Sequence, residues 1–192
     1  GLMEKIGPVL AARKDRFVLV SMAAALTIPD LRERGCGDWP LIRIMPNTPS
    51  AIGEGVIFYT CDGVTAEEEA AFLENMAGAG RLLPLDDHLM DAGSAVAGCG
   101  PAFVDLFIEA MADAAVADGM PRAAACRIAA QAVLGSAKMV LETGKHPGEL
   151  KDMVCSPGGT TIEAVWSLER HGFRGCVMEA MRACTEKAKR MV

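Results

Sequence analysis

Residues 41–69 read LIRIMPNTPSAIGEGVIFYTCDGVTAEEE, and this stretch decides the fold class. It holds two short runs of apolar and β-branched residues, 41–44 and 56–60, separated by a loop with two prolines. Thr65 follows as a candidate N-cap, and three glutamates occupy the next turn, where the helix dipole favours carboxylates. Strand, loop, strand and helix in this order predict an open α/β sheet.

Two further runs extend the predicted sheet on either side. Phe17–Val20 is apolar enough for a buried strand, and 81–84 predicts a last strand, which Pro84 confines to an edge or an end. No G-x-G-x-x-G turn occurs in the sequence, although a nucleotide-binding sheet normally opens with that turn. Residues 1–85 are therefore expected to be the C-terminal part of such a sheet, with its front part missing.

From residue 86 onward the pattern becomes helical. Pro101 is expected at the first position of a long helix, because proline is tolerated there. The acidic residues Asp105, Glu109 and Asp113 form one narrow stripe on this helix, and most of its other residues are apolar. Four helices are predicted in this part of the chain: 101–118, 121–143, 161–169 and 174–191.

These helices carry more apolar surface than one small chain can cover. We therefore expect an obligate homodimer in which helices of two copies interleave, and a tight monomeric bundle is the alternative.

Composition narrows the functional classes. The chain has 192 residues, a net charge of −6 and no basic patch, so nucleic-acid binding is not expected. No run approaches 18 uninterrupted apolar residues, so no membrane-spanning helix is expected either. Seven cysteines without C-x-x-C spacing argue against a disulfide framework and against a zinc site or other metal centre. They are typical of small buried residues in a reducing cytoplasm.

The segment Ser156-Pro157-Gly158-Gly159-Thr160-Thr161 is the first candidate site. Two glycines allow a close backbone approach, and successive free N–H groups at a helix start can bind an anion. No lysine or arginine lies inside the segment, which suits a small carboxylate better than a phosphate. The alternative is a plain glycine-rich turn with a threonine N-cap.

Two strand exits supply further candidates. Met45-Pro46-Asn47 follows a predicted strand, where open α/β sheets place their ligands, and the Asn47 amide offers a donor and an acceptor. Its alternative role is to cap its own backbone. Ala23 and Ala24 follow the strand before it, and their small side chains permit the approach of a flat ring or simply pack a helix.

The motifs V-S-x-A-A, R-x-M-P-N-T-P, G-x-G-P-A-[YF] and H-P-x-E-L-K-D-M-V-x-S-P-G-G-T-T occur in this order along the chain. Together they resemble the pyrroline-5-carboxylate reductase family over essentially all 192 residues. The chain departs from the usual family pattern in having Ala25 for Gly, Cys99 for Ser and Phe103 for Tyr, and in lacking the glycine-rich dinucleotide loop.

The resemblance implies an α/β plus all-α chain: the C-terminal part of a Rossmann-like NADP-binding domain at 1–85, then a helical dimerisation and substrate-binding domain at 86–192. It implies reduction of 1-pyrroline-5-carboxylate to L-proline by hydride transfer from NADPH, with NADH as the other possible cofactor. Homodimers are implied, and family members often form larger rings of dimers.

Site residues follow from the same resemblance. The expected substrate-carboxylate residues are Ser156, Gly158, Gly159, Thr160 and Thr161. Thr161 is also the candidate catalytic hydroxyl for the ring nitrogen. The expected cofactor residues are Ala23, Ala24, Met45, Pro46 and Asn47.

Two other functions compete with this interpretation. One is a dimerisation fragment without catalysis, which the missing loop favours. The other is a 3-hydroxy-acid dehydrogenase, for which Lys138 would be the catalytic lysine.

Overall fold

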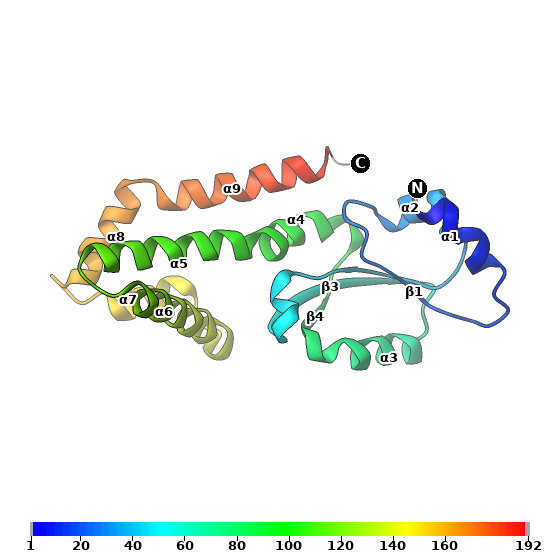
Figure 1. The fold of residues 1–192 in the computed structure, drawn as a ribbon, viewed down its shortest axis with the longest axis horizontal. Coiled ribbons are helices and arrows are strands. Elements are labelled where there is room, and N and C mark those ends of the chain that lie inside the picture. The colour runs from blue at the N-terminus through cyan, green and yellow to red at the C-terminus, as the bar shows by residue number, and fades with distance from the viewer. Residues whose placement is uncertain (1, 191–192) are drawn as a thin grey trace. The chain divides into compact units, whose positions relative to one another are not determined.

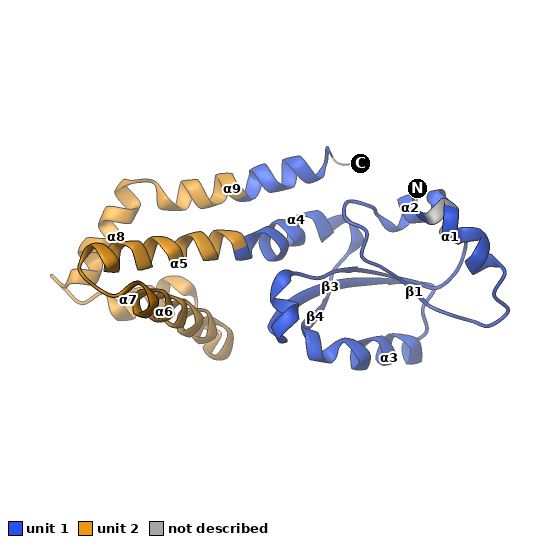
Figure 2. Cartoon of the chain, viewed as in Figure 1, with its two compact units in different colours: residues 1–101, 181–192 blue, residues 102–180 orange. Residues whose placement is uncertain are grey.

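The structure is a computed structural model that describes residues 2–190 of the chain. It divides into two compact units (Figure 2). Residues 1–101 and 181–192 form the first unit, and residues 102–180 form the second. The sequence-based boundary between residues 85 and 86 stays a prediction.

A four-stranded sheet forms the centre of the first unit (Figure 1). The strands follow one another in the order β1-β2-β3-β4, and β2 and β3 are antiparallel, whereas the two outer pairs are parallel. Their bounds are β1 Leu19–Ser21, β2 Leu41–Met45, β3 Gly55–Asp62 and β4 Gly80–Pro84. All four predicted strands are thus confirmed, with β4 at an edge, although β1 begins two residues later than Phe17.

Helix α3 (Ala66–Met76) covers this sheet through a buried aromatic residue. Thr65 is its N-cap, as predicted, and Glu68 completes a capping box by accepting a hydrogen bond from Thr65 N at 2.9 Å. Phe72 joins Ile57 and Tyr59 in the main core cluster, which contributes roughly 1.5–3 kcal/mol for each large side chain removed from water.

Shorter helical segments surround the sheet. The sequence analysis did not predict the helices at Leu2–Ala11 (α1) and Ile28–Leu31 (α2), nor the turns that follow α2 and β2. The bounds of these helical segments are α1 Leu2–Ala11, α2 Ile28–Leu31, η1 Arg32–Cys36, η2 Thr48–Ile52 and η3 Ala77–Ala79.

Pro101 does not begin a helix, contrary to the prediction. It lies inside a helical run that continues through η4 (Asp87–Leu89), α4 (Met90–Ser94), η5 (Ala95–Cys99) and α5 (Gly100–Ala117). The run tolerates proline because η5 is a π-helical turn, a local widening that accommodates a missing N–H. The carbonyl of Ala97, four residues before Pro101, accepts a hydrogen bond from the Asn47 side chain instead.

The second unit consists of helices whose shared core is made of small residues. Ala112 of α5 packs against Ala125 and Ala129, so the two helices can approach closely. The further helices are α6 Arg122–Thr143, α7 Pro147–Val154, α8 Thr160–Arg170 and α9 Phe173–Ala188. The four predicted helices are confirmed, and α7 is an addition to them.

Much apolar surface of the second unit is uncovered within one chain. Leu106, Leu141 and Met178 are each at least two-thirds exposed. By length and composition alone, Asp87–Ala117 and Arg122–Thr143 could span a membrane, so the expectation of no such helix stays a prediction. Carboxylates at Asp105, Glu109 and Asp113 would be costly in hydrocarbon, which favours a protein partner for these faces.

Candidate functional site

The segment from Ser156 to Gly159 forms a tight turn between α7 and α8. Gly159 N donates to Ser156 O at 3.0 Å, Pro157 and Gly158 occupy the central positions, and Gly158 has a φ of +67°. Proline followed by a left-handed residue is the pattern of a type II turn. The left-handed φ therefore favours glycine at position 158, whereas a Cβ on Gly159 would lie 2.4 Å from Ser156 Oγ and would require that side chain to rotate away.

This turn leaves the start of α8 open. Gly159 is the N-cap, and no side chain caps the helix within the part of the chain that the structure describes. The N–H groups of Thr160, Thr161 and Ile162 have no intrahelical acceptor at these positions, and the threonines are exposed. Three backbone donors and the positive end of a helix dipole therefore face a place where a carboxylate can bind.

All five predicted substrate residues lie in this turn or at the start of α8. The hydroxyls of Ser156, Thr160 and Thr161 stand on exposed residues within the turn and the first turn of α8. His146, a short way upstream, caps α7 by accepting from Gly148 N through Nδ1 at 3.0 Å. That contact gives His146 a structural role.

The exit of β1 carries the first group of predicted cofactor residues. Ala23 N donates to Ser21 Oγ at 3.4 Å, so the chain turns directly after the strand. Ala25 has a φ of +61°, the only positive φ on a non-glycine residue among those described. This is the position where the family usually has glycine, which explains why glycine would be favoured there.

A cavity of about 420 Å³ lies in the first unit beside this exit. It brings Ala24 together with Met45, two of the five predicted cofactor residues, whereas Ala23 lines a different cavity of about 390 Å³. The lining of the larger cavity is Ala24, Ala25, Met45, Asp91, Ser94, Ala95, Cys99, Ala183, Cys184, Lys187 and Ala188. Most of these side chains are small, which leaves room for a flat ring.

The thiol of Cys99 in this cavity is not an activated nucleophile. Burial raises the pKa of the Cys99 thiol, and a hydrogen bond with the neighbouring Cys184 thiol raises it further. Reactive cysteines have a lowered pKa, so the raised pKa of the Cys99 thiol indicates a wall residue and not a nucleophile.

Asn47 uses its amide inside the protein. Its Oδ1 accepts from Val56 N at 2.9 Å, and its Nδ2 donates to Ala97 O at 3.0 Å. The amide thus joins the end of β2 to β3 and to the π-helical turn before Pro101. It holds Met45 and Pro46 in place through backbone groups that are distant in the sequence. Its side chain makes no capping hydrogen bond to the helical turn that follows it, so the alternative of capping its own backbone is not what the structure shows.

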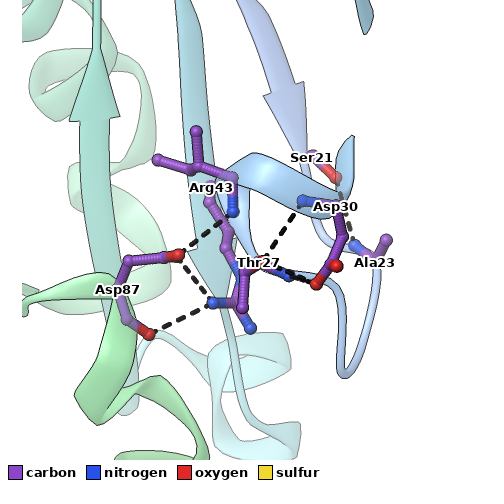
Figure 3. A network of polar contacts seen from close by, with 7 residues as sticks. Ser21, Ala23, Thr27, Asp30, Arg43 and Asp87 are labelled. Carbon is purple, nitrogen blue, oxygen red and sulfur yellow. Dashed lines mark hydrogen bonds and ion pairs between the residues drawn. The ribbon is translucent and has the colours of Figure 1, made fainter. Parts of the chain in front are cut away.

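Arg43 and Asp87 form a polar link that the sequence analysis did not single out. Arg43, on β2, is 1% exposed, and its Nη1 donates to Asp87 Oδ1 at 2.7 Å (Figure 3). The other carboxylate oxygen of Asp87 accepts from Ile28 N at 3.1 Å. Arg43 Nε and Nη2 have no hydrogen-bond partner among the described residues.

One signal in the sequence could have identified this link. Arg43 interrupts the apolar run LIRIM, and a charge on a buried strand needs a partner. Its partner lies 44 residues away, so the sequence did not indicate Asp87.

The substrate group and the cofactor group belong to different compact units. The Ser156–Thr161 turn lies in the unit of residues 102–180, and Ala23, Ala24, Met45, Pro46 and Asn47 lie in the other. Each group keeps its own local geometry as described.

Comparison with known proteins finds matches that all name the same family. The family described as pyrroline-5-carboxylate reductase dimerisation matches residues 87–191. A pyrroline-5-carboxylate reductase of Escherichia coli (strain K12) is 48% identical over 193 aligned residues, covering 100% of this chain and 72% of the relative. One of Pisum sativum is 44% identical and covers 97% and 67%.

Solved structures agree with these matches. A Plasmodium falciparum pyrroline carboxylate reductase with NADP bound has a TM-score of 0.90 at 33% identity, covering 99% of this chain and 74% of that one. A 1-pyrroline-5-carboxylate reductase from Streptococcus pyogenes has a TM-score of 0.85 at 34% identity, covering 96% and 72%.

Proposed function

This chain belongs to the pyrroline-5-carboxylate reductase family, and we propose that it reduces 1-pyrroline-5-carboxylate to L-proline with NADPH as hydride donor. The observation that carries this proposal is the open, uncapped start of α8 behind the Ser156–Gly159 turn. A small carboxylate fits three backbone donors that have no cation beside them in the turn.

The residues at the strand exits fit the nicotinamide end of the cofactor. Ala24, Ala25 and Met45 line a cavity in which most side chains are small. The two hydrogen bonds of the Asn47 amide hold the segment that follows Met45 in place. NADPH, when bound, supplies the hydride that the imine carbon accepts. The choice of NADPH over NADH is part of the proposal, and the NADP-bound relative supports it.

Catalysis by this chain's own residues is mainly positioning. The amides of Thr160, Thr161 and Ile162 hold the substrate carboxylate, which orients the ring and can contribute roughly 7–11 kcal/mol in favourable cases. The Thr161 hydroxyl is proposed to hydrogen-bond the ring nitrogen, where it steadies the protonated imine. The iminium form accepts hydride readily, so no strong acid is needed.

We further propose that the active form is a cytoplasmic homodimer built through the helices of the second unit. The match to a dimerisation family supports this, as do the uncovered apolar faces on α5, α6 and α9. Assembly of dimers into larger rings, and the absence of nucleic-acid or membrane partners, stay predictions. The free thiols of Cys61, Cys126 and Cys176 support a reducing compartment.

The dehydrogenase alternative finds less support. Lys138 is two-thirds exposed on α6 and pairs with Glu142, one turn later, at 3.4 Å. A lysine in a solvated pair of this kind lacks the burial that tunes a catalytic amine.

A substrate panel tests the proposed function. In the complete protein we expect saturable oxidation of NADPH with 1-pyrroline-5-carboxylate, and no reduction of NADP⁺ with 3-hydroxy acids. The opposite pattern would favour the dehydrogenase. Absence of both reactions, together with absence of NADPH binding, would favour a dimerisation fragment without catalysis.

A further inference from the structure

The loop between β1 and α2 contains one residue in a strained backbone conformation. Ala25 lies in the left-handed region with a φ of +61°, which L residues other than glycine disfavour. Such a conformation persists only where the surrounding structure over-determines it. Ala23 and Ala24, the residues assigned to the cofactor side, directly precede this position.

The far end of the loop is anchored at the start of α2. Thr27 and Asp30 form a capping box, with Thr27 N donating to Asp30 Oδ2 at 2.8 Å. The next amide, Ile28 N, donates outside the loop to Asp87 Oδ2 at 3.1 Å. Asp87 thus fixes where the loop ends.

Asp87 is itself held by a side chain that is almost fully buried. Arg43 is 1% exposed on β2 and donates from Nη1 to Asp87 Oδ1 at 2.7 Å and to Asp87 O at 3.4 Å. One carboxylate therefore links the rigid sheet on one side to the loop on the other, as Figure 3 shows. Burying a guanidinium with two unpaired nitrogens costs folding free energy. We therefore expect Arg43 to have a role beyond packing.

We propose that Arg43 and Asp87 are positioning residues for hydride transfer, which fix the loop of residues 22–27 against the nicotinamide side of the site. This inference rests on the proposed function. The two residues act on the shape of the loop through Ile28 N, and neither lines the cavities that Ala23 and Ala24 line.

Asp87→Asn tests the role with little change in volume. An asparagine can accept from Arg43 or from Ile28 N through its oxygen, but its NH₂ group cannot accept from the other donor. We expect kcat to fall about 10-fold or more, because small misplacements of reacting atoms are costly. The KM for NADPH should change less than kcat, since the rest of the cofactor still binds.

The kinetic isotope effect separates positioning from loss of structure. With NADPH deuterated at C4, the isotope effect on kcat should rise in Asp87→Asn, because hydride transfer becomes more rate-limiting. Asp62→Asn is the matched control: Asp62 pairs with Arg32 at 2.6 Å in the same unit, and Arg32 also holds the Gly37 and Trp39 carbonyls. The control should keep kcat within about 2-fold and leave the isotope effect unchanged.

The outcomes are distinguishable. If the wild-type protein does not reduce the imino acid, the proposed function fails before any variant is compared. If the wild type is active and Asp87→Asn matches Asp62→Asn in kcat and isotope effect, the positioning role is wrong. Should Asp87→Asn not fold, Asp87→Glu keeps the charge but shifts the carboxylate by one methylene. A normal kcat and isotope effect in that variant would equally overturn the inference.

Discussion

At the scale of single residues, the proposed chemistry depends on backbone groups more than on reactive side chains. The amides after Gly159 are free because a proline–glycine turn delivers the chain to α8 without a capping side chain. Burial raises the pKa of the Cys99 thiol in the proposed cofactor cavity, which disfavours a reactive thiolate there. Thr161 is the one hydroxyl to which we assign a role in the reaction.

Thr161→Val removes this hydroxyl while keeping the shape of the side chain. A hydrogen bond to a charged group contributes about 1.5–3 kcal/mol, so kcat/KM for the imino acid should fall roughly 10- to 100-fold. Thr161→Ser keeps the hydroxyl and should stay within about 3-fold of wild type. Steady-state kinetics on both variants measures this, and an unchanged kcat/KM in Thr161→Val would remove the role.

Ala25→Gly should stabilise the protein. The left-handed φ of +61° disfavours alanine, whereas glycine adopts it freely. The gain, after allowing for the greater freedom of glycine in the unfolded chain, should be up to about 1 kcal/mol. Urea unfolding followed by circular dichroism measures it. Ala24→Gly is the control and should be destabilising, and a lower stability for Ala25→Gly would show that the strain is absent.

At the scale of elements, the sequence predicted well those helix starts and strands that depend only on nearby residues. The Thr65-x-x-Glu68 spacing predicted the start of α3, and the runs of β-branched residues predicted the strands. Helix α7 was missed because its Pro147-Gly148 start resembles a turn. Pro101 was misplaced because a π-helical turn and the Asn47 amide compensate for its missing N–H, and both depend on distant residues.

Helix α3 should show a pH-dependent stability through Glu68. Hydrogen bonds from Arg16, above all, and from Thr65 N lower the pKa of Glu68 from 4.5 to about 2. Because the pKa in the folded state is depressed, the stabilisation is present above pH 4.5 and is lost as pH falls toward about 2.

Glu68→Gln should therefore be less stable than wild type at pH 7, and the two should converge as the pH falls through this window. Thermal unfolding of both proteins from pH 7 to pH 2.5 measures the difference. Glu74→Gln, further along the same helix, is the control. A difference between Glu68→Gln and wild type that does not depend on pH would contradict the assigned ion pair.

At the scale of the whole molecule, the chain combines two units with different tasks. The sheet unit carries the proposed cofactor residues and the Arg43–Asp87 link, and the helical unit carries the proposed carboxylate site and the uncovered apolar faces. Their family membership is shown by relatives that match nearly the whole chain. The candidate carboxylate site could be predicted from the sequence because it is one continuous segment, whereas the Arg43–Asp87 link is formed only by folding.

The central claim is that the backbone amides at the start of α8 bind a carboxylate. Amide NMR of the complete protein with NADP⁺ present, titrated with L-proline and separately with L-prolinamide, tests it directly. We predict large, saturable shifts of the Thr160, Thr161 and Ile162 amides with L-proline and much smaller ones with L-prolinamide, which lacks the carboxylate. Unchanged amides with L-proline, or equal shifts with both compounds, would contradict the claim.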